Sequence, residues 1–254
     1  MTNMNNHRVP LQIILALIIT FCLFQTAHAQ PLPGIDLQVQ PTDEPQQVVD
    51  SVKLLVLLSL LSLVPAIILM MTSFTRIIIV LSLLRSALGI HQTPPNQVLI
   101  GLALFLTFFI MSPVYEQINE QAVQPYLADE LAQEEAWERA AAPVREFMFK
   151  QTREKDLQLF IELSDTPNPE SEEDVPLSVL MPSFIISELK TAFQMGFLIY
   201  VPFLVIDMVV ASTLMSMGMF MLPPVIISLP FKILLFVMVD GWHLVIKSLV
   251  ESFG

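Results

Sequence analysis

The chain has 254 residues, of which 54% are hydrophobic and 14% charged, and its mean hydropathy is +0.66. A typical globular domain carries about 25% charged residues, so this composition indicates a membrane-associated protein. The formal net charge of −12 argues against a nucleic-acid-binding protein, because phosphate binding needs a basic surface. Long continuous apolar stretches, with seven glycines and 19 prolines, favour an all-α fold over a membrane β-barrel.

Residues 1–29 have the pattern of a secretory signal peptide. An apolar core at 11–24 is followed by Ala-His-Ala at 27–29, the small-x-small pattern of a cleavage site. The core is shorter than the roughly 20 residues that span a bilayer. We therefore expect cleavage after residue 29, which would remove Cys22, rather than an uncleaved anchor.

The rest of the chain divides into four segments. Residues 30–50 form a polar linker, which we expect to be periplasmic and loosely ordered. Residues 51–114 form a first helical hairpin region, whose second helix Asn96 should cap. Residues 115–176 form a helical insert, net acidic through sixteen acidic and five basic side chains. Residues 177–254 form a second helical hairpin region, which brings the total to about four hydrophobic helical segments.

Prolines are expected to shape these helices, because proline removes a main-chain hydrogen bond. Pro65 should kink the first apolar helix, and Pro202 should break the apolar stretch at 177–221. Pro143 should end an exposed, Ala- and Glu-rich helix over 127–142. The fold is therefore predicted to consist of kinked helical hairpins.

The distribution of charge predicts a topology. The link at 72–97 carries two arginines and no acidic residue, and basic links stay in the cytoplasm. Together with the leader, this bias predicts a periplasmic N-terminus, a cytoplasmic arginine link and a periplasmic acidic insert.

Seven ionisable side chains lie within apolar stretches. They are Arg76, Arg85, Glu188, Lys190, Asp207, Lys232 and Asp240. A charge at the bilayer centre costs about 2.5–3.5 kcal/mol on insertion scales, so these helices should pack largely on protein around a wet cavity. We expect Glu188 to pair with Lys232, within one chain or between copies. The alternative is that each reaches the membrane interface separately.

Methionines recur at every second position from 215 to 221, a spacing that is not a helical stripe. Gly218 and the prolines at 223 and 224 indicate a loop or a broken helix end. Methionine is flexible and fills irregular gaps, so a ring of such loops would plug a pore and still yield to varied cargo. Two alternatives are a Cu(I) site, although neither His nor Cys is near, and ordinary core filling.

The sequence lacks several motifs of enzymes and cofactor sites. It contains no Gly-rich phosphate loop, no HExxH and no GxSxG. Glu172, Glu173 and Asp174 are candidate ligands for a hard cation, although a flexible acidic loop is the default interpretation. We therefore expect no enzyme activity and no cofactor or metal.

Several stretches carry a resemblance to a known family. They are 183–197 (SFIISELKTAFQMGF), 218–224 (GMFMLPP), 230–232 (PFK) with 240–242 (DGW), 72–76 (TSFTR) and 92–97 (QTPPNQ). Together they resemble the FliP family, the export-gate proteins of the bacterial flagellar type III secretion apparatus. Ser183 stands where many relatives have Ala, and Phe220 replaces a Met in the methionine run; neither change affects the plug hypothesis, because Phe is also a bulky apolar side chain.

The resemblance implies a homo-oligomeric, pentameric ring in the flagellar basal body. The ring would assemble with FliQ, FliR and FlhB and let unfolded flagellar proteins cross the inner membrane. Its tilted hairpins would form a cone, so that apolar segments need not cross the bilayer. By the matching motif, the family's gasket falls on Met219, Phe220 and Met221, with Met217 beside them.

We therefore predict an α-helical export-gate subunit with a Met-rich gasket. Two alternatives remain open at this point. One is a small-ion or proton channel that uses Asp207, Glu188 and Lys232. The other is a purely structural assembly scaffold, in which the Met-rich loop is only core.

Overall fold

The computed structural model describes residues 45–90, 92–164, 169 and 171–254. The regular elements of these residues are all helical, as predicted. They are α2 (Pro45–Met70), α3 (Phe74–Ala87), α4 (Asn96–Ile118), the π-helical turn η1 (Asn119–Val123), α5 (Gln124–Leu127), α6 (Gln133–Gln151), α7 (Glu154–Leu163), the 3₁₀ turn η2 (Glu172–Asp174), α8 (Leu177–Ser216), α9 (Pro224–Met238) and α10 (Gly241–Glu251). The expected signal peptide, with Cys22, lies outside the described residues.

The chain divides into two units, Met1–Leu58 and Ser59–Gly254, with the boundary inside α2. α2 is a long apolar helix that begins at Pro45, so the last residues of the predicted linker are helical. It continues through Pro65 to its end, and most of its apolar side chains are exposed. The second unit contains all the contacts discussed below.

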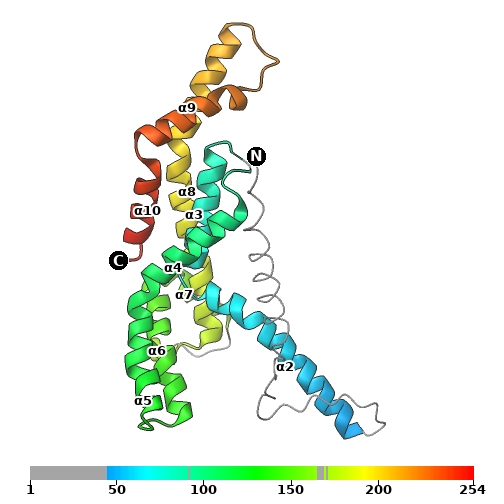
Figure 1. The fold of residues 1–254 in the computed structure, drawn as a ribbon, viewed down its shortest axis with the longest axis vertical. Coiled ribbons are helices and arrows are strands. Elements are labelled where there is room, and N and C mark those ends of the chain that lie inside the picture. The colour runs from blue at the N-terminus through cyan, green and yellow to red at the C-terminus, as the bar shows by residue number, and fades with distance from the viewer. Residues whose placement is uncertain (1–44, 91, 165–168, 170) are drawn as a thin grey trace, which may run out of the picture. The chain divides into compact units, whose positions relative to one another are not determined.

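Helix α3 lies at the centre of the second unit, between α4 and α8 (Figure 1). Its residues Ile77, Val80 and Leu81 are completely buried, and they pack with Leu99 of α4 and Ala192 of α8. Burial of these apolar side chains stabilises α3, although the helix has only 14 residues and carries two arginines.

The closest approach of α3 and α8 occurs at Gly196. A Cβ atom added there would lie 2.2 Å from the Leu83 Cδ1 atom. Because that separation is far below van der Waals contact, a side chain at position 196 would force the two helices or the Leu83 side chain to shift.

Helix α4 begins one residue earlier than a helix capped by Asn96 would. Asn96 is its first residue and does not cap it; the Asn96 Oδ1 atom instead accepts a hydrogen bond of 2.7 Å from Arg85 Nη1. The helix passes through Pro113 to Ile118 and continues into η1 and α5. It therefore leads without a break into the insert.

The insert is built from η1, α5, α6 and α7. The prediction that Pro143 ends a helix over 127–142 is wrong, because α6 runs from Gln133 to Gln151 with Pro143 inside it and buried. Burial of the proline ring beside α4 offsets the missing main-chain hydrogen bond. Further along α6, Met148 packs against Phe184 of α8, which attaches the insert to the apolar part of the unit.

Helix α8 has 40 residues and passes through Pro182 and Pro202. The prediction that Pro202 breaks the stretch is therefore wrong, and packing against α3 and α9 maintains the helix. After α9, the chain turns at Asp240, whose φ of 51° is left-handed. Helices α9 and α10 are bent by 65° relative to each other.

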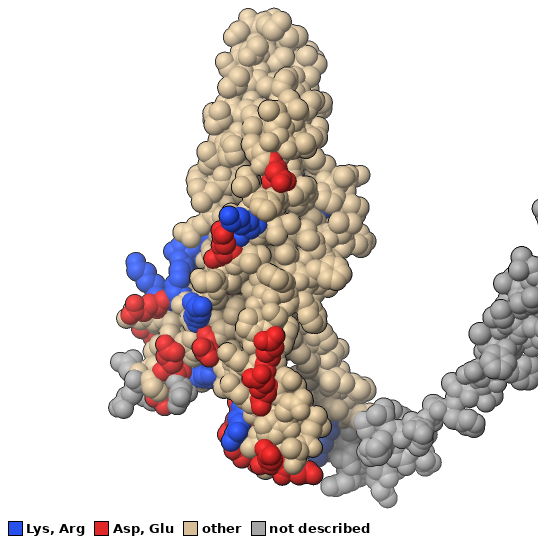
Figure 2. Space-filling view, turned by 60° about the vertical axis from the view of Figure 1, so that its left-hand side comes forward, with Lys and Arg blue, Asp and Glu red and all other residues tan. Residues whose placement is uncertain are grey.

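Among the residues that the structure describes, three helical stretches are long and apolar enough to cross a membrane, and the bent pair α9–α10 is a possible fourth. The three are Val52–Met70, Asn96–Leu127 and Leu177–Ser216. This confirms the prediction of an all-α membrane protein with about four apolar segments. Figure 2 shows that charged side chains gather over the insert, whereas the end formed by α8 and α9 is almost free of them on the face shown.

Candidate functional site

The Met-rich segment is a loop between α8 and α9, as its sequence predicts. Helix α8 ends at Ser216, and Gly218 follows with a left-handed φ of 76°. The Gly218 N–H donates to Met215 O and the Met219 N–H donates to Leu214 O, both at 3.0 Å. This pair of bonds is a Schellman motif, which ends a helix at a glycine. The sequence thus ends α8 where the Met-rich loop begins.

Most of the bulky side chains of this loop are exposed. Met221 is 95% exposed and Phe220 is 78% exposed; Met217 is also exposed, and Met219 is half-buried. Three of the four predicted gasket residues therefore contribute little to the core of this chain. A surface of this kind is typical of a segment that another molecule or another copy covers.

An ion pair between a buried lysine and a partly exposed aspartate joins the two helices that carry the loop. Lys232 Nζ of α9 donates to Asp207 Oδ2 of α8 at 2.6 Å and to the carbonyl oxygen of Ala87 at 3.3 Å. The Ser228 hydroxyl donates to Asp207 Oδ1. Lys232 is almost completely buried, so this pair fixes α9 against α8 and against the end of α3.

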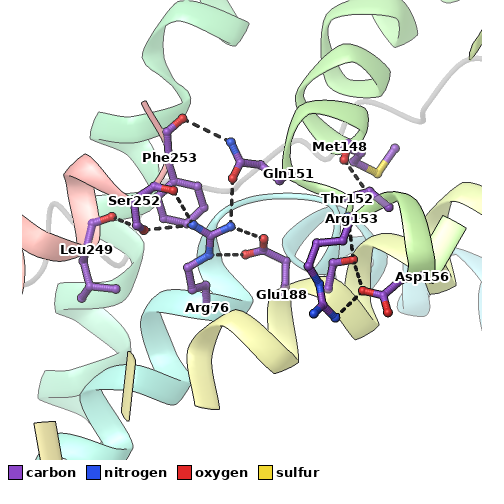
Figure 3. Close-up of polar contacts among 11 residues, drawn as sticks. Arg76, Met148, Gln151, Thr152, Arg153, Asp156, Glu188, Leu249, Ser252 and Phe253 are labelled. Carbon is purple, nitrogen blue, oxygen red and sulfur yellow. Dashed lines mark hydrogen bonds and ion pairs between the residues drawn. The ribbon is translucent and has the colours of Figure 1, made fainter. Parts of the chain in front are cut away.

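A second polar cluster surrounds Arg76 of α3 (Figure 3). Arg76 Nε donates to Glu188 Oε2 at 3.0 Å, and Nη2 donates to Glu188 Oε1, which makes the pair bidentate. Nη1 donates to the main-chain oxygen and the hydroxyl of Ser252, at 2.7 and 2.9 Å. Nη2 also donates to Gln151 Oε1 at 2.9 Å. We call these four residues, with Phe253, the Arg76 junction.

In the Arg76 junction, all five N–H donors of the guanidinium group have acceptors. These hydrogen bonds offset the free energy lost when the charged group is removed from water. The ring of Phe253 stacks on the group, with 3.8 Å between Arg76 Cζ and the ring centroid. Gln151 Nε2 donates in turn to the Phe253 carbonyl oxygen at 3.2 Å. One arginine therefore links α3, α6, α8 and the residues after α10.

The predicted pair of Glu188 with Lys232 is not formed within the chain. Glu188 binds Arg76, and Lys232 binds Asp207. Both residues are buried as expected, but they belong to separate clusters on different parts of α8. Arginine suits Glu188 better than lysine does, because its planar fork matches a carboxylate at two points.

A third polar contact attaches α7 to α8 (Figure 3). The Ser187 hydroxyl donates to Asp156 Oδ2 at 2.6 Å, and Arg153 Nη2 donates to the same oxygen. Burial alone would raise the pKa of Asp156; the hydrogen bonds from Ser187 and Arg153, with the charges of Arg153 and Lys190, lower it below its ordinary value. Asp156 is therefore held as a carboxylate.

Of the acidic residues at 172–174, Asp174 makes a local contact. Asp174 accepts hydrogen bonds from the main-chain N–H and the hydroxyl of Ser171, at 3.0 and 2.8 Å. The first of these bonds, together with the Asp174 main-chain N–H donating to the Ser171 side chain, forms a capping box. Within the part of the chain that the structure describes, no group of three or more His, Cys, Asp or Glu side chains is placed to hold a metal ion.

Sequence reasoning missed the partners of both buried pairs. Arg76 and Asp207 were each recognised as charged residues in apolar surroundings, but not as partners. A usable signal was present for Ser228, which precedes Lys232 by four residues and so lies on the same helix face. Gln151 and Ser252 gave no comparable signal, because they come from segments distant in sequence.

Comparisons with known proteins agree with the sequence motifs. The model of the FliP family matches residues 57–249. A protein of Bacillus subtilis named flagellar biosynthetic protein FliP is 57% identical over 217 residues, which cover 85% of this chain and 98% of the relative. Proteins of the same name from Pectobacterium carotovorum (58% identical, covering 87% of this chain and 86% of the relative) and Aquifex aeolicus (51%, 87% and 92%) are similar along most of their lengths.

Proposed function

Because this chain belongs to the FliP family, we propose that it is a subunit of the flagellar protein export gate in the bacterial inner membrane. In this proposal five copies form a ring in the flagellar basal body and assemble with FliQ, FliR and FlhB. The acidic insert lies in the periplasm, and unfolded flagellar proteins cross through the pore that the ring surrounds. The match over residues 57–249, which includes both apolar regions and the insert, supports this assignment.

The observation that carries the gating part of the proposal is the exposure of the loop. Phe220 and Met221 are bulky and apolar, yet most of their surface is accessible in the single chain. Apolar surface is stabilised when it is removed from water, by roughly 25 cal/mol per Å². Loops from several copies that meet at an axis would bury these side chains against one another and close the pore.

Methionine is suited to a closure that must open for many substrates. Its unbranched thioether side chain adopts many rotamers and packs against irregular shapes. The pair of Lys232 with Asp207 holds α9 against α8, so the base of the hairpin stays in place while the loop yields. In this mechanism Met217, Met219, Phe220 and Met221 form the gasket, and the ion pair positions it.

The test replaces Met219, Phe220 and Met221 together by alanine in cells that assemble flagella. We expect leakage of small solutes through the membrane while secretion of flagellar proteins continues, because the seal is weakened but the pore remains. Met208→Ala is the matched control, since Met208 is an exposed methionine of α8 outside the loop. It should leave both readouts unchanged.

Two other functions would give different results in the same experiment. A proton or small-ion channel that uses Asp207, Glu188 and Lys232 predicts a change in proton conductance alone. A structural scaffold predicts a change in assembly alone. The observed contacts do not favour a proton path through these residues, since Glu188 is bound by Arg76 and Asp207 is bound by Lys232. Saturated pairs of this kind support a structural role for the charges and a separate role for the loop.

A further inference from the structure

The insert carries an apolar groove between two of its helical segments. It has a volume of about 360 Å³ and is lined mainly by Val123 of η1, Tyr126 and Leu127 of α5, and Ala136 and Trp137 of α6. Leu127 is 71% exposed and Trp137 is 70% exposed. We call this surface the insert groove. Contact of such a tryptophan and leucine with water is unfavourable in free energy, so this surface is a candidate binding site.

The segment that forms the insert groove carries exposed acidic side chains, which we call the rim of the groove. Residues 116–140 contain seven acidic side chains and one basic side chain. That base, Arg139, already donates to Glu135 at 2.7 Å. Figure 2 shows acidic side chains over this end of the unit, with some basic ones among them. A partner that covers the groove must therefore pass over a surface of net negative charge.

We propose that the insert groove binds a basic amphipathic helix of another protein. Apolar side chains of that helix fill the groove against Trp137 and Leu127, while its Lys and Arg side chains lie over the acidic rim. A groove between two helical segments fits a third helix, whose side chains form a ridge of matching shape. The charge of the rim selects a basic partner and speeds the encounter.

The same charges argue against two other occupants. A second copy that presents this same surface would bring a second acidic rim against the first, and one that presents another face still belongs to a chain of net charge −12. A bilayer surface with anionic lipids would repel the rim in the same way. The inference goes beyond the proposed gate, because it uses no residue of the Met-rich loop and holds whether or not that loop seals a pore.

The test uses the full chain in nanodiscs of phosphatidylcholine and a fluorescent synthetic helix of leucine and lysine as the probe. A helix with glutamate in place of lysine is the matched probe. We expect the Leu/Lys helix to bind at least about tenfold more tightly than the Leu/Glu helix, measured by fluorescence anisotropy against empty nanodiscs. Its affinity should fall as salt is raised, because salt screens the rim.

Two variants locate the binding. Trp137→Ala and Leu127→Ala remove exposed anchors, so the fold should survive and the affinity should fall by about tenfold or more. Leu163→Ala removes an equally exposed leucine of α7 outside the groove and should change nothing. Equal binding of both probes, an equal loss in Leu163→Ala, or a Trp137-dependent preference for anionic lipid would each overturn the proposal.

Discussion

The two ends of α8 differ in what they bury. Near its beginning, Glu188 is completely buried, and its charge is matched by Arg76 at two points. At its far end, the chain leaves the apolar side chains of Phe220 and Met221 almost entirely exposed. The first region buries a matched pair of charges, and the second leaves bulky apolar side chains uncovered by the rest of the chain.

The two regions therefore differ in whether a single chain supplies the contacts of their side chains. The Arg76 junction uses every guanidinium donor within the chain, so it should be rigid in an isolated subunit. The loop has its main-chain bonds, but its bulky side chains are exposed; in the proposed gate, other copies cover them. Variants of the junction should therefore affect stability, and variants of the loop should affect sealing.

The largest effect is expected from Glu188→Ala. It leaves the Arg76 guanidinium buried without its counter-charge, which should lower the free energy of unfolding by about 3–5 kcal/mol. Thermal unfolding in detergent, followed by circular dichroism, measures the loss. Glu135→Ala is the control, because the Glu135–Arg139 pair is exposed and such pairs contribute about 0–1 kcal/mol. Equal losses in the two variants would contradict a buried ionic junction.

The contact between α3 and α8 gives the second prediction. Gly196→Ala places a Cβ atom against Leu83, and overpacking of this kind costs about 1–3 kcal/mol. Adding Leu83→Ala should restore most of the loss, which a double-mutant cycle measures. Gly101→Ala on α4 meets open space and should stabilise the helix by roughly 0.5–1 kcal/mol. A loss at Gly101 as large as that at Gly196 would refute the close approach.

The ion pair at the base of the hairpin gives a smaller effect. Lys232→Met removes the partner of Asp207, whose side chain is partly exposed and can be hydrated. We expect a loss of about 1–2 kcal/mol and a looser α8–α9 hairpin. Spin labels at Val205 and Leu234, which are exposed on the two helices, should then show a broader distance distribution.

Lys247→Met is the matched control for this variant. The Lys247–Glu251 pair of α10 is exposed, with 3.8 Å between Lys247 Nζ and Glu251 Oε1. Removal of that lysine should leave the distance distribution narrow. An equally narrow distribution in Lys232→Met would show that apolar packing alone positions the loop.

Local signals predicted the helices and the loop well. Long apolar runs located the membrane-length helices, and Gly218 with the prolines at 223 and 224 located the end of α8. Pro143 and Pro202 misled the prediction, because both lie inside helices that tertiary packing maintains. The cost of a missing hydrogen bond is local, whereas the packing that offsets it comes from other helices.

The buried pairs could not be predicted because their partners are far apart along the chain. Arg76 and Glu188 are separated by 112 residues, and Asp207 and Lys232 by 25. Burial predicted that each charge needs a partner, but not which one. The choice depends on where α3, α8 and α9 pack, and on the match of a guanidinium fork to a carboxylate.

The smallest expected effect concerns pH and the attachment of α7. Folding lowers the pKa of Asp156, so as the pH falls the unfolded chain takes up a proton first. The contribution of Asp156 to stability is therefore complete above about pH 4, near the pKa of the unfolded group. It is lost as the pH falls through the lower pKa of the folded state.

Asp156→Asn should thus lower stability at neutral pH and make the attachment of α7 less sensitive to acid. Hydrogen exchange of α7, measured at neutral and at acidic pH, tests this locally, because the Ser187–Asp156 bond is a direct contact between α7 and α8. Glu135→Gln, in an exposed pair, should keep the acid sensitivity of the parent chain. If Asp156→Asn keeps it too, other carboxylates control the acid response, and α7 is held by its apolar contacts rather than by this hydrogen bond.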